Sequence, residues 1–312
     1  MLLALLLPTI FMIKLPFVSF LLSSHFAILD SLNLKYLNIN GPPLNQYLLT
    51  LNYFILFALL YFLESRNKYI YKKIQMALVA FQCFYFLPIN NFLYFTVSFI
   101  NVGQGDSTLL VYKNKTILVD TGGSLKEDIA TSNLIPFLRK NRIYKIDYLF
   151  ITHYDMDHYY ASISLKRNFI VQKIYDYNNF KELNISDLTI YNINTNIDKN
   201  VEENDKSLVL HCSTPSTSLL LMGDASKNVE YKIMREYPNI RATYLKCGHH
   251  GSDTSTSAEF VKWLKPKEAI ISCGEKNKYG HPHKEVIEEL KRENVLIRRT
   301  DEEGTITYRF FC

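Results

Sequence analysis

Four side chains that can bind a metal ion lie within six residues of one another: His153, Asp155, Asp157 and His158. They follow the apolar run 148–151, which has the composition of a buried strand, so we expect them where a strand ends and a loop turns towards a helix. Side chains two residues apart in an extended segment point the same way, which lets His153 and Asp155 bind one ion together. Asp157 and His158 lie where the loop bends, and face either a second ion or the other side of the first. Imidazole combined with carboxylate suits Zn, Mn or Fe, and the carboxylates favour harder ions than three histidines would.

Five more candidate side chains occur further along the chain: Asp224, His249, His250, His281 and His283. The first follows the strand-like run 218–222, as expected when a metal site at a sheet edge is assembled from distant segments. A polar surface loop with histidines placed by chance is the alternative for the 153–158 cluster. Because six of the eight histidines of the chain fall in these groups, we favour a built site.

Charge is unevenly distributed along the 312 residues. The first 92 hold six basic and two acidic residues, and the remainder holds 29 basic and 28 acidic ones, so most of the net charge of +5 belongs to the apolar N-terminal third. The rest is nearly neutral, so net charge does not indicate a large DNA-binding surface, although a local basic patch is still compatible with this composition. The five cysteines form no CxxC pair, and we interpret them as small buried apolar side chains rather than a disulfide framework or a zinc ribbon.

Three apolar stretches come first in the chain, at residues 2–29, 47–63 and 74–89. The first lacks the positive start and small-residue end of a secretory signal peptide, so we expect it to stay in the membrane. The second has no charge and is about long enough to span a hydrocarbon core, whereas the third is more polar and is the weakest candidate. Buried helices of a soluble protein are the alternative for these stretches.

Membrane orientation follows from the loop 65–73, which holds four basic residues and which the positive-inside rule puts in the cytoplasm. If 74–89 spans the membrane, everything after residue 92 lies outside the cell, and if it does not, that part is cytoplasmic. We expect a multi-pass protein of the cell membrane with its C-terminal domain outside.

A domain boundary is expected at 88–91, which separates a membrane segment over 1–92 from a domain over 93–312. Helices are predicted at 128–141, 226–236, 256–264 and 284–293, and strands at 93–99, 109–111, 116–119, 148–151, 169–176, 187–193, 206–211, 217–222, 242–246, 268–273, 294–299 and 304–311. The early strands come with few helices and the later ones alternate with them. This pattern indicates an α/β fold of two stacked sheets with helices outside, a four-layer sandwich.

Six segments resemble a known family in type and order: FINVGQGDS (99–107), ILVDTGG (117–123), THYDMDH (152–158), LLMGD (220–224), LKCGHHGSDTSTS (245–257) and YGHPH (279–283). Together they resemble the metallo-β-lactamase superfamily, and more closely the C-terminal hydrolase domain of the ComEC family of competence DNA-uptake proteins. The resemblance covers residues 93–312, and residues 8–92 look like the tail of that family's membrane domain, as in a truncated or split member. It implies an αββα sandwich preceded by two to three transmembrane helices.

The resemblance also implies one or two divalent ions, Mn2+ or Zn2+, between the sheets. By position, His153 and Asp155 would bind one ion and Asp157 and His158 the other. Asp224 would bridge the two ions.

A histidine of the 249–250 pair would complete a shell. His249 is preferred as this metal ligand, and His250 is kept as the alternative. The superfamily histidine between the HxHxDH and GD motifs has no clear match, and Asn204 stands near its place, which weakens one ion site. Asp120 is expected to brace the ligand loop rather than to bind metal.

Two residues are assigned to catalysis, Asp157 and His281. His281 is a candidate for stabilising the transition state, with a structural role as the alternative. We expect His283 to be structural, and His211, which falls on a strand, to be a packed histidine.

One departure from the family pattern follows the ligand cluster. Family members usually have two glycines shortly after the DH, whereas this chain has Tyr159, Tyr160 and Ala161. A bulky tyrosine there is expected to crowd or reshape the cleft, because glycine allows a closer backbone approach.

These residues lead to the hypothesis of a metal-dependent phosphodiesterase, a DNA nuclease associated with DNA uptake during competence. Ser252, Thr254 and Ser255 precede a predicted helix and are candidates for phosphate binding, with helix capping as the alternative. Another esterase or lactonase of the same fold, and a non-catalytic DNA-binding channel component, are the rival functions. The expected partners are DNA, the membrane, and a separate channel subunit or further copies of the chain, since three spans are too few for a DNA channel.

Overall fold

The computed structural model describes residues 90–195, 197 and 200–312, together with residues 69, 70, 72, 73, 76, 77 and 80. The stretches 2–29 and 47–63 and most of 74–89 lie outside these residues, so their assignment as membrane spans stays a prediction. Among the residues that are described, no helix is both long enough and apolar enough to cross a membrane.

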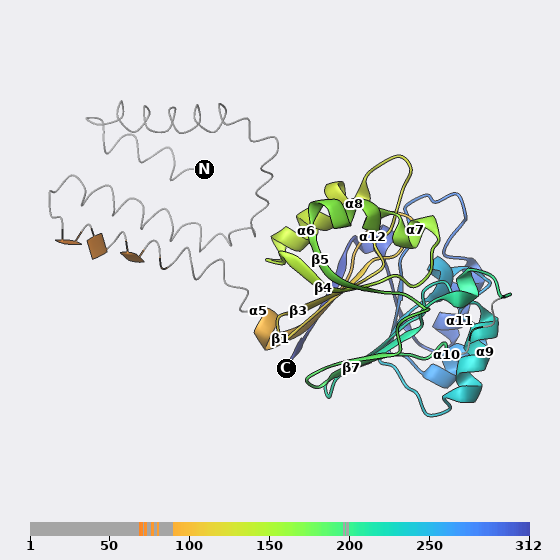
Figure 1. Ribbon diagram of the computed structural model, residues 1–312. Helices are drawn as coiled ribbons and strands as arrows, with labels where there is room; N and C mark the ends of the chain where they lie inside the picture. Colours follow the sequence, from red (N-terminus) through yellow and green to blue (C-terminus); the bar gives the residue numbers. More distant parts are fainter. Residues whose placement is uncertain are drawn as a thin grey trace, which may run out of the picture. The chain divides into compact units, whose positions relative to one another are not determined.

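Two sheets face each other in residues 90–312 (Figure 1). The first sheet has the strand order β13-β1-β2-β3-β4-β5, in which β3–β4 and β4–β5 are parallel and the other pairs antiparallel. Its strands are β1 (Tyr94–Phe99), β2 (Thr108–Tyr112), β3 (Lys115–Val119), β4 (Lys145–Phe150), β5 (Ile170–Tyr175) and β13 (Ile306–Phe311). The C-terminal strand β13 therefore completes a sheet that the N-terminal strands begin.

The second sheet has the order β12-β11-β10-β9-β8-β7-β6, parallel from β9 to β12 and antiparallel from β6 to β9. Its strands are β6 (Glu182–Ile185), β7 (Leu188–Asn192), β8 (Leu210–Ser213), β9 (Ser218–Leu221), β10 (Tyr244–Lys246), β11 (Glu268–Ile271) and β12 (Leu296–Arg299). Since parallel neighbours end at the same edge, the loops after β9, β10 and β11 emerge together.

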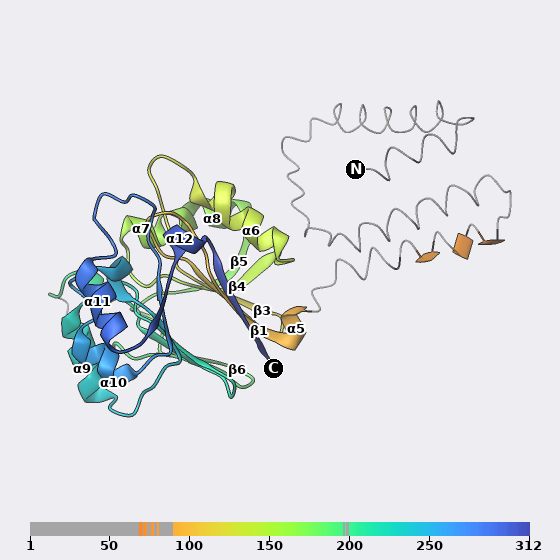
Figure 2. The same ribbon diagram turned by 180° about the vertical axis from the view of Figure 1, so that it is seen from behind.

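Helices cover the outer face of each sheet, which gives the predicted αββα order (Figures 1 and 2). The helical segments that begin or accompany the first sheet are α5 (Asn90–Leu93), the π-helix η2 (Ala130–Leu134), α6 (Ile135–Lys140), α7 (Met156–Tyr159), α8 (Ala161–Asn168) and α12 (Thr300–Glu303). Those of the second sheet are α9 (Lys227–Glu236), α10 (Ala258–Leu264) and α11 (Lys284–Arg292), with the 3-10 turns η3 (Asn204–Lys206) and η4 (Gly248–Gly251). The four-layer sandwich is confirmed.

Apolar side chains fill three layers. One cluster lies between the sheets and includes Phe150 and Leu210; a second lies under η2, α6 and α8, and a third under α9, α10 and α11. All five residues of β2 are buried, because both faces of the first sheet are covered. Burying one such Leu, Ile or Phe side chain contributes roughly 1.5–3 kcal/mol, so the sandwich holds its loops on a rigid frame.

The main departures from the predicted elements are short segments. The strand predicted at 206–211 begins only at Leu210, because Asn204–Lys206 forms a 3-10 turn and Ser207 turns its hydroxyl towards the ligand loop. β6 escapes prediction because this edge strand is exposed or half-buried throughout and has no continuous apolar run.

Candidate metal centre

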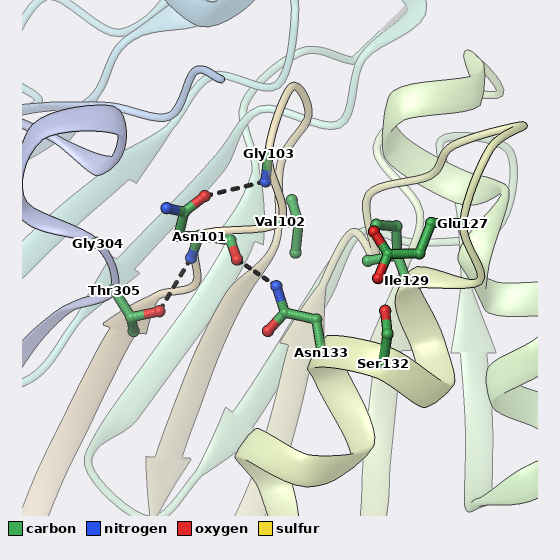
Figure 3. A pocket seen from close by; sticks show the side chains of 9 residues that line it. All are labelled: Asn101, Val102, Gly103, Glu127, Ile129, Ser132, Asn133, Gly304 and Thr305. Atoms are coloured by element: carbon green, nitrogen blue, oxygen red, sulfur yellow. Dashed lines mark hydrogen bonds between the residues drawn. The ribbon is translucent and has the colours of Figure 1, made fainter. Parts of the chain in front are cut away.

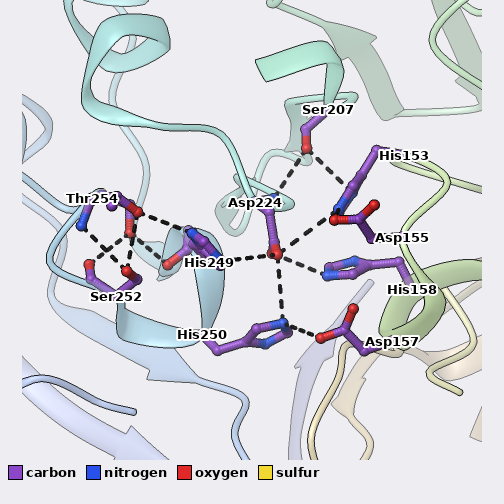
Figure 4. Close-up of polar contacts among 12 residues, drawn as sticks. His153, Asp155, Asp157, His158, Ser207, Asp224, His249, His250, Ser252 and Thr254 are labelled. Atoms are coloured by element: carbon purple, nitrogen blue, oxygen red, sulfur yellow. Dashed lines mark hydrogen bonds and ion pairs between the residues drawn. The ribbon is translucent and has the colours of Figure 1, made fainter. Parts of the chain in front are cut away.

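The ligand loop of the first sheet runs from the end of β4 into α7. His153 and His158 are fully buried, with ring centroids 4.1 Å apart. Asp155 is extended at the N-terminal end of α7 and makes no capping hydrogen bond through its side chain, and its carboxylate oxygen lies 3.7 Å from His153 Nε2. The helix α7 then presents Asp157 and His158 from its first turn. The loop therefore turns all four candidate ligands towards the second sheet (Figure 4).

The second sheet brings Asp224 to the middle of this group. Its Oδ1 lies 3.0 Å from His158 Nε2, and its Oδ2 lies 3.9 Å from His153 Nε2 and 3.6 Å from His250 Nε2. Gly223, which precedes it, has φ +55°, and a Cβ there would lie 3.0 Å from the Ser207 side chain, so the turn after β9 favours glycine. Asp224 thus lies between the histidines of the ligand loop and His250.

Five buried polar atoms at the cluster have no hydrogen-bond partner: Asp106 Oδ1, His153 Nε2, His158 Nε2, Asp224 Oδ1 and His250 Nε2. Of these residues, Asp106, His158, Asp224 and His250 offer ligand atoms that all lie within 4.8 Å of one another. Buried polar atoms are normally hydrogen-bonded, so such a group calls for a missing partner. Two donors bound to one ion at about 2.1 Å lie roughly 3.0–3.5 Å apart, close to the contacts of 3.0 to 3.9 Å seen here. The residues present therefore fit a divalent metal ion.

The pKa values of the clustered side chains also favour a bound cation. Burial alone would raise the pKa of Asp224, but His158 and His250 outweigh it and hold that pKa well below its ordinary value. Burial would lower the pKa of His250, but Asp224 and Asp106 raise it to about 10. The carboxylates thus draw positive charge into a buried site, and a divalent ion would supply that charge with the histidines deprotonated.

Two contacts hold the histidines from behind. Asp120 accepts hydrogen bonds from Thr152 N (2.8 Å) and Thr152 Oγ1 (2.7 Å), and its Oδ2 lies 2.8 Å from His158 Nδ1. These are the contacts predicted for a brace of the ligand loop. Ser207 Oγ accepts from Asp224 N and lies 3.4 Å from His153 Nδ1. Ser207, and not Asn204, is therefore the residue of this segment that touches the ligands.

The structure places His250, the alternative to the preferred His249, inside the candidate ligand group. His250 is buried, and its Nε2 lies 3.2 Å from Asp157 Oδ2, inside the group of orphaned atoms. The His249 side chain is 28% exposed, its Nε2 lies 3.9 Å from Asp224 Oδ2, and its Nδ1 is 3.0 Å from Thr254 Oγ1. Both residues have positive φ in η4, and this backbone twist, which the sequence does not reveal, decides which ring enters the cluster.

The three hydroxyls predicted to bind phosphate, those of Ser252, Thr254 and Ser255, take part in hydrogen bonds within the protein itself. Ser255 is fully buried and donates to Gly248 O, and the Ser252 and Thr254 hydroxyls hydrogen-bond one another beside His249. Backbone amides of the following helix start are occupied as well, since Thr256 N and Ser257 N donate to the buried carboxylate of Glu230. The hydroxyls support the local backbone and His249, and of the three only Thr254 is exposed.

The tyrosines after the ligand cluster do not crowd it. Tyr159 packs against the outer core of the first sheet, and Tyr160 is 39% exposed. Ala161 N donates to Gly122 O, which ties this turn to the loop after β3. The expected reshaping of the cleft by Tyr159 is therefore not seen.

His281 stands at the outer side of the His250 ring. Their centroids are 6.2 Å apart with nearly parallel planes, and Tyr279 stacks on the other side at 5.6 Å. Burial lowers the pKa of His281 to about 4, assisted by the nearby His250 and His249, so its imidazole is neutral at pH 7.

His283 Nδ1 accepts from Asp253 N, which agrees with a structural role. His211 is buried on β8, which confirms that it is a packed histidine.

The sequence analysis missed two buried residues beside the cluster, Asp106 and Lys246. A carboxylate oxygen of Asp106 lies within 4.8 Å of ligand atoms of His158, Asp224 and His250. The Gly-rich turn before Asp106 was the available signal, but it says nothing of a partner 140 residues away.

A cavity of about 470 Å3 lies beside the same loop, and none of the candidate ligands lines it (Figure 3). Two residues that do line it, Asn101 and Asn133, form hydrogen bonds with neighbouring backbone through their side chains.

Known proteins are similar to this chain over about two thirds of its length. Residues 100–196 match the model of the metallo-beta-lactamase superfamily. ComE operon protein 3 of Bacillus subtilis is 34% identical over 254 residues, covering 69% of this chain and 33% of that protein. Recombination protein 2 of Haemophilus influenzae is 32% identical over 234 residues, covering 69% and 29%. The chain thus spans about a third of the length of the curated relatives it matches.

Similarity to solved structures is weaker. CmlA, a diiron β-hydroxylase from Streptomyces venezuelae, aligns at 12% identity with a TM-score of 0.45, over 69% of this chain and 54% of that one, which does not bear on function. The curated homologues of this chain are therefore proteins of the ComEC competence family, and its C-terminal region carries a metallo-β-lactamase superfamily domain.

Proposed function

We propose that the domain is a metal-dependent phosphodiesterase that cleaves DNA during competence-linked uptake. The observation that carries the proposal is a group of buried residues from both sheets, Asp106, His158, Asp224 and His250, whose ligand atoms lie within 4.8 Å of one another and include atoms without a hydrogen-bond partner. DNA as substrate is supported by the homologues, among them "Competence protein ComA" of Neisseria gonorrhoeae and "Recombination protein 2" of Haemophilus influenzae.

The ligands divide into two sets that share Asp224. In the first set, Asp157, His158 and His250 would hold one ion, since their metal-facing atoms are the closest together. In the second, His153 and Asp155 would hold the other, more weakly. Bound Mn2+ or Zn2+ would lower the pKa of a water molecule and withdraw charge from a phosphoryl oxygen.

Protein groups would then orient the substrate and handle protons. Asp157 is the carboxylate of the tighter set with a partly exposed side chain, at 30%, so it can reach both the ion and solvent and accept a proton from the attacking water. His281, neutral at pH 7, would donate an N–H to a phosphoryl or leaving oxygen without adding a buried charge. His249, which contacts Thr254 through Nδ1, would line the edge of the site next to His281.

The setting of the domain is part of the proposal. Residues 1–92 would form a membrane segment with two to three transmembrane helices, and 93–312 the hydrolase domain, outside the cell if 74–89 spans. A place beside a DNA channel formed by another subunit or by further copies of this chain completes the proposal. The homologues, of which this chain covers about a third, support competence as its setting.

The test is DNA cleavage by the purified full chain with Mn2+, with Zn2+ and with chelator. We expect cleavage that needs metal and is lost in Asp157→Ala. A matched control is Asp147→Asn, which removes another buried carboxylate, at the start of β4, bonded to Thr116 N and far along the strand from the ligand loop. If DNA stays intact under every condition while a small ester is hydrolysed, the domain is another hydrolase and not a nuclease. If DNA binds and nothing is hydrolysed, the domain is a channel component.

A further inference from the structure

Asp106 and Lys246 form a buried ion pair next to His250. The pair lies beside Nδ1, the ring nitrogen on the opposite side from Nε2. We propose that Asp106 and Lys246 form an outer brace of the metal centre, in which Asp106 positions His250 for the ion and Lys246 keeps Asp106 from binding the ion itself. This inference rests on the proposed metal centre and assigns positioning residues to it.

Asp106 meets His250 on the nitrogen that faces away from the cluster. His250 Nδ1 lies 3.0 Å from Ser272 O and 3.4 Å from Asp106 Oδ1, whereas Nε2 faces Asp157 and Asp224. Ser272 O accepts the ring proton on Nδ1, which leaves the lone pair of Nε2 towards the ion, and the Asp106 carboxylate places a negative charge beside the same Nδ1 at ion-pair distance. A carboxylate behind a metal-bound imidazole also increases its basicity as a ligand.

The backbone fixes Asp106 against the ligand loop. Asp106 N donates to Asp157 O (3.1 Å), and Gly122 N donates to Asp106 O (2.7 Å). Gly105 has φ +140°, and a Cβ there would lie 2.4 Å from Asp157 O, so only glycine allows this approach. The loop before β2 therefore packs directly against the backbone of Asp157.

Lys246 occupies the other oxygen of Asp106. Its Nζ lies 2.7 Å from Asp106 Oδ2 and donates to Cys247 O at 2.9 Å, and both side chains are almost fully buried. A carboxylate bound so closely to an ammonium is a poor ligand for a nearby cation. The pair thus supplies a negative charge at His250 in which Lys246 holds Oδ2, while Oδ1 has no hydrogen-bond partner of its own.

A double substitution separates this role from mere stabilisation. Asp106→Asn and Lys246→Met alone each leave one buried charge without its partner and should lower the melting temperature, whereas the double variant leaves none. In the purified full chain, we expect the double variant to melt near the wild type and to bind Mn2+ about 10–100-fold more weakly by calorimetry. Asp147→Asn, the matched carboxylate control, should lower stability without changing Mn2+ affinity.

Other outcomes decide against the brace. A double variant that binds Mn2+ as tightly as the wild type shows that the pair only stabilises the fold. A change in coordination number in the visible spectrum of the Co2+-loaded double variant shows that Asp106 is itself a ligand. If the wild type binds no Mn2+, the proposed metal centre fails and this inference with it, which the wild-type titration distinguishes from failure of the brace alone.

Discussion

The two halves of the candidate centre share Asp224 but differ in how they are built. On the His158 side, His158 and His250 are buried, each has a carboxylate behind it, and the contacts to Asp224 Oδ1 and Asp157 Oδ2 are 3.0 and 3.2 Å. On the His153 side, the corresponding contacts to Asp155 and Asp224 are 3.7 and 3.9 Å, and the Asp155 side chain is 49% exposed.

This difference predicts unequal affinities of the two halves for an ion. Buried ligands whose partners fix their orientation lose little freedom on binding an ion, whereas an exposed carboxylate must be ordered first and competes with water. Ser207, which lies beside His153, offers only a hydroxyl already bonded to Asp224 N. We therefore expect the His158 side to bind its ion more tightly than the His153 side.

The largest effect is expected where the halves meet. Asp224→Asn keeps the shape of the side chain but removes the charge shared by both ions, so metal-dependent DNA cleavage should fall by more than about 100-fold. Cleavage rates with saturating Mn2+ measure this, and a melting curve controls for folding. Retained activity would mean that the halves do not share this carboxylate.

Next in size is the contrast within the histidine pair. His250→Ala should weaken Mn2+ binding by about 10–100-fold, because it removes a buried ligand with its brace. His249→Ala, at the neighbouring exposed ring, should change Mn2+ affinity by only a few fold and act mainly on the cleavage rate. The reverse order in calorimetric titrations would restore His249 as the ligand.

A smaller effect is expected on the His153 side. Asp155→Ala should leave the tighter Mn2+ site in place and lower the cleavage rate by roughly tenfold, with a partial recovery at high Mn2+. Titration at rising Mn2+ concentration checks this. Loss of all metal binding in this variant would make the two sides a single site.

The smallest effect concerns a histidine outside the centre. Burial lowers the pKa of His211 below 6.5, although Arg241 O lies 3.0 Å from its Nε2. As the pH falls through 6.5, the unfolded chain binds a proton there that the folded chain does not, so the folded state loses stability. His211→Gln removes this titration, and its melting temperature should fall less than that of the wild type between about pH 7.5 and pH 5.5. Equal losses would show that this histidine does not contribute.

The comparison of the halves also shows what the sequence could predict. His153 to His158 are contiguous and follow a buried strand, so their convergence could be predicted from local pattern alone. The choice of His250 over His249 depends on two residues with positive φ, and the Asp106–Lys246 pair depends on a loop and a strand that are far apart in the chain. Tertiary geometry decides both, and the burial of the Ser255 hydroxyl as well.

The most direct measurement is a calorimetric titration of the metal-free full chain with Mn2+, beside Asp224→Asn. We predict one tight and one weaker site in the wild type, and in the variant the loss of the tight site together with weaker binding at the second. A wild-type chain that binds no divalent ion, or a variant that binds it unchanged, would contradict a metal centre between the two sheets.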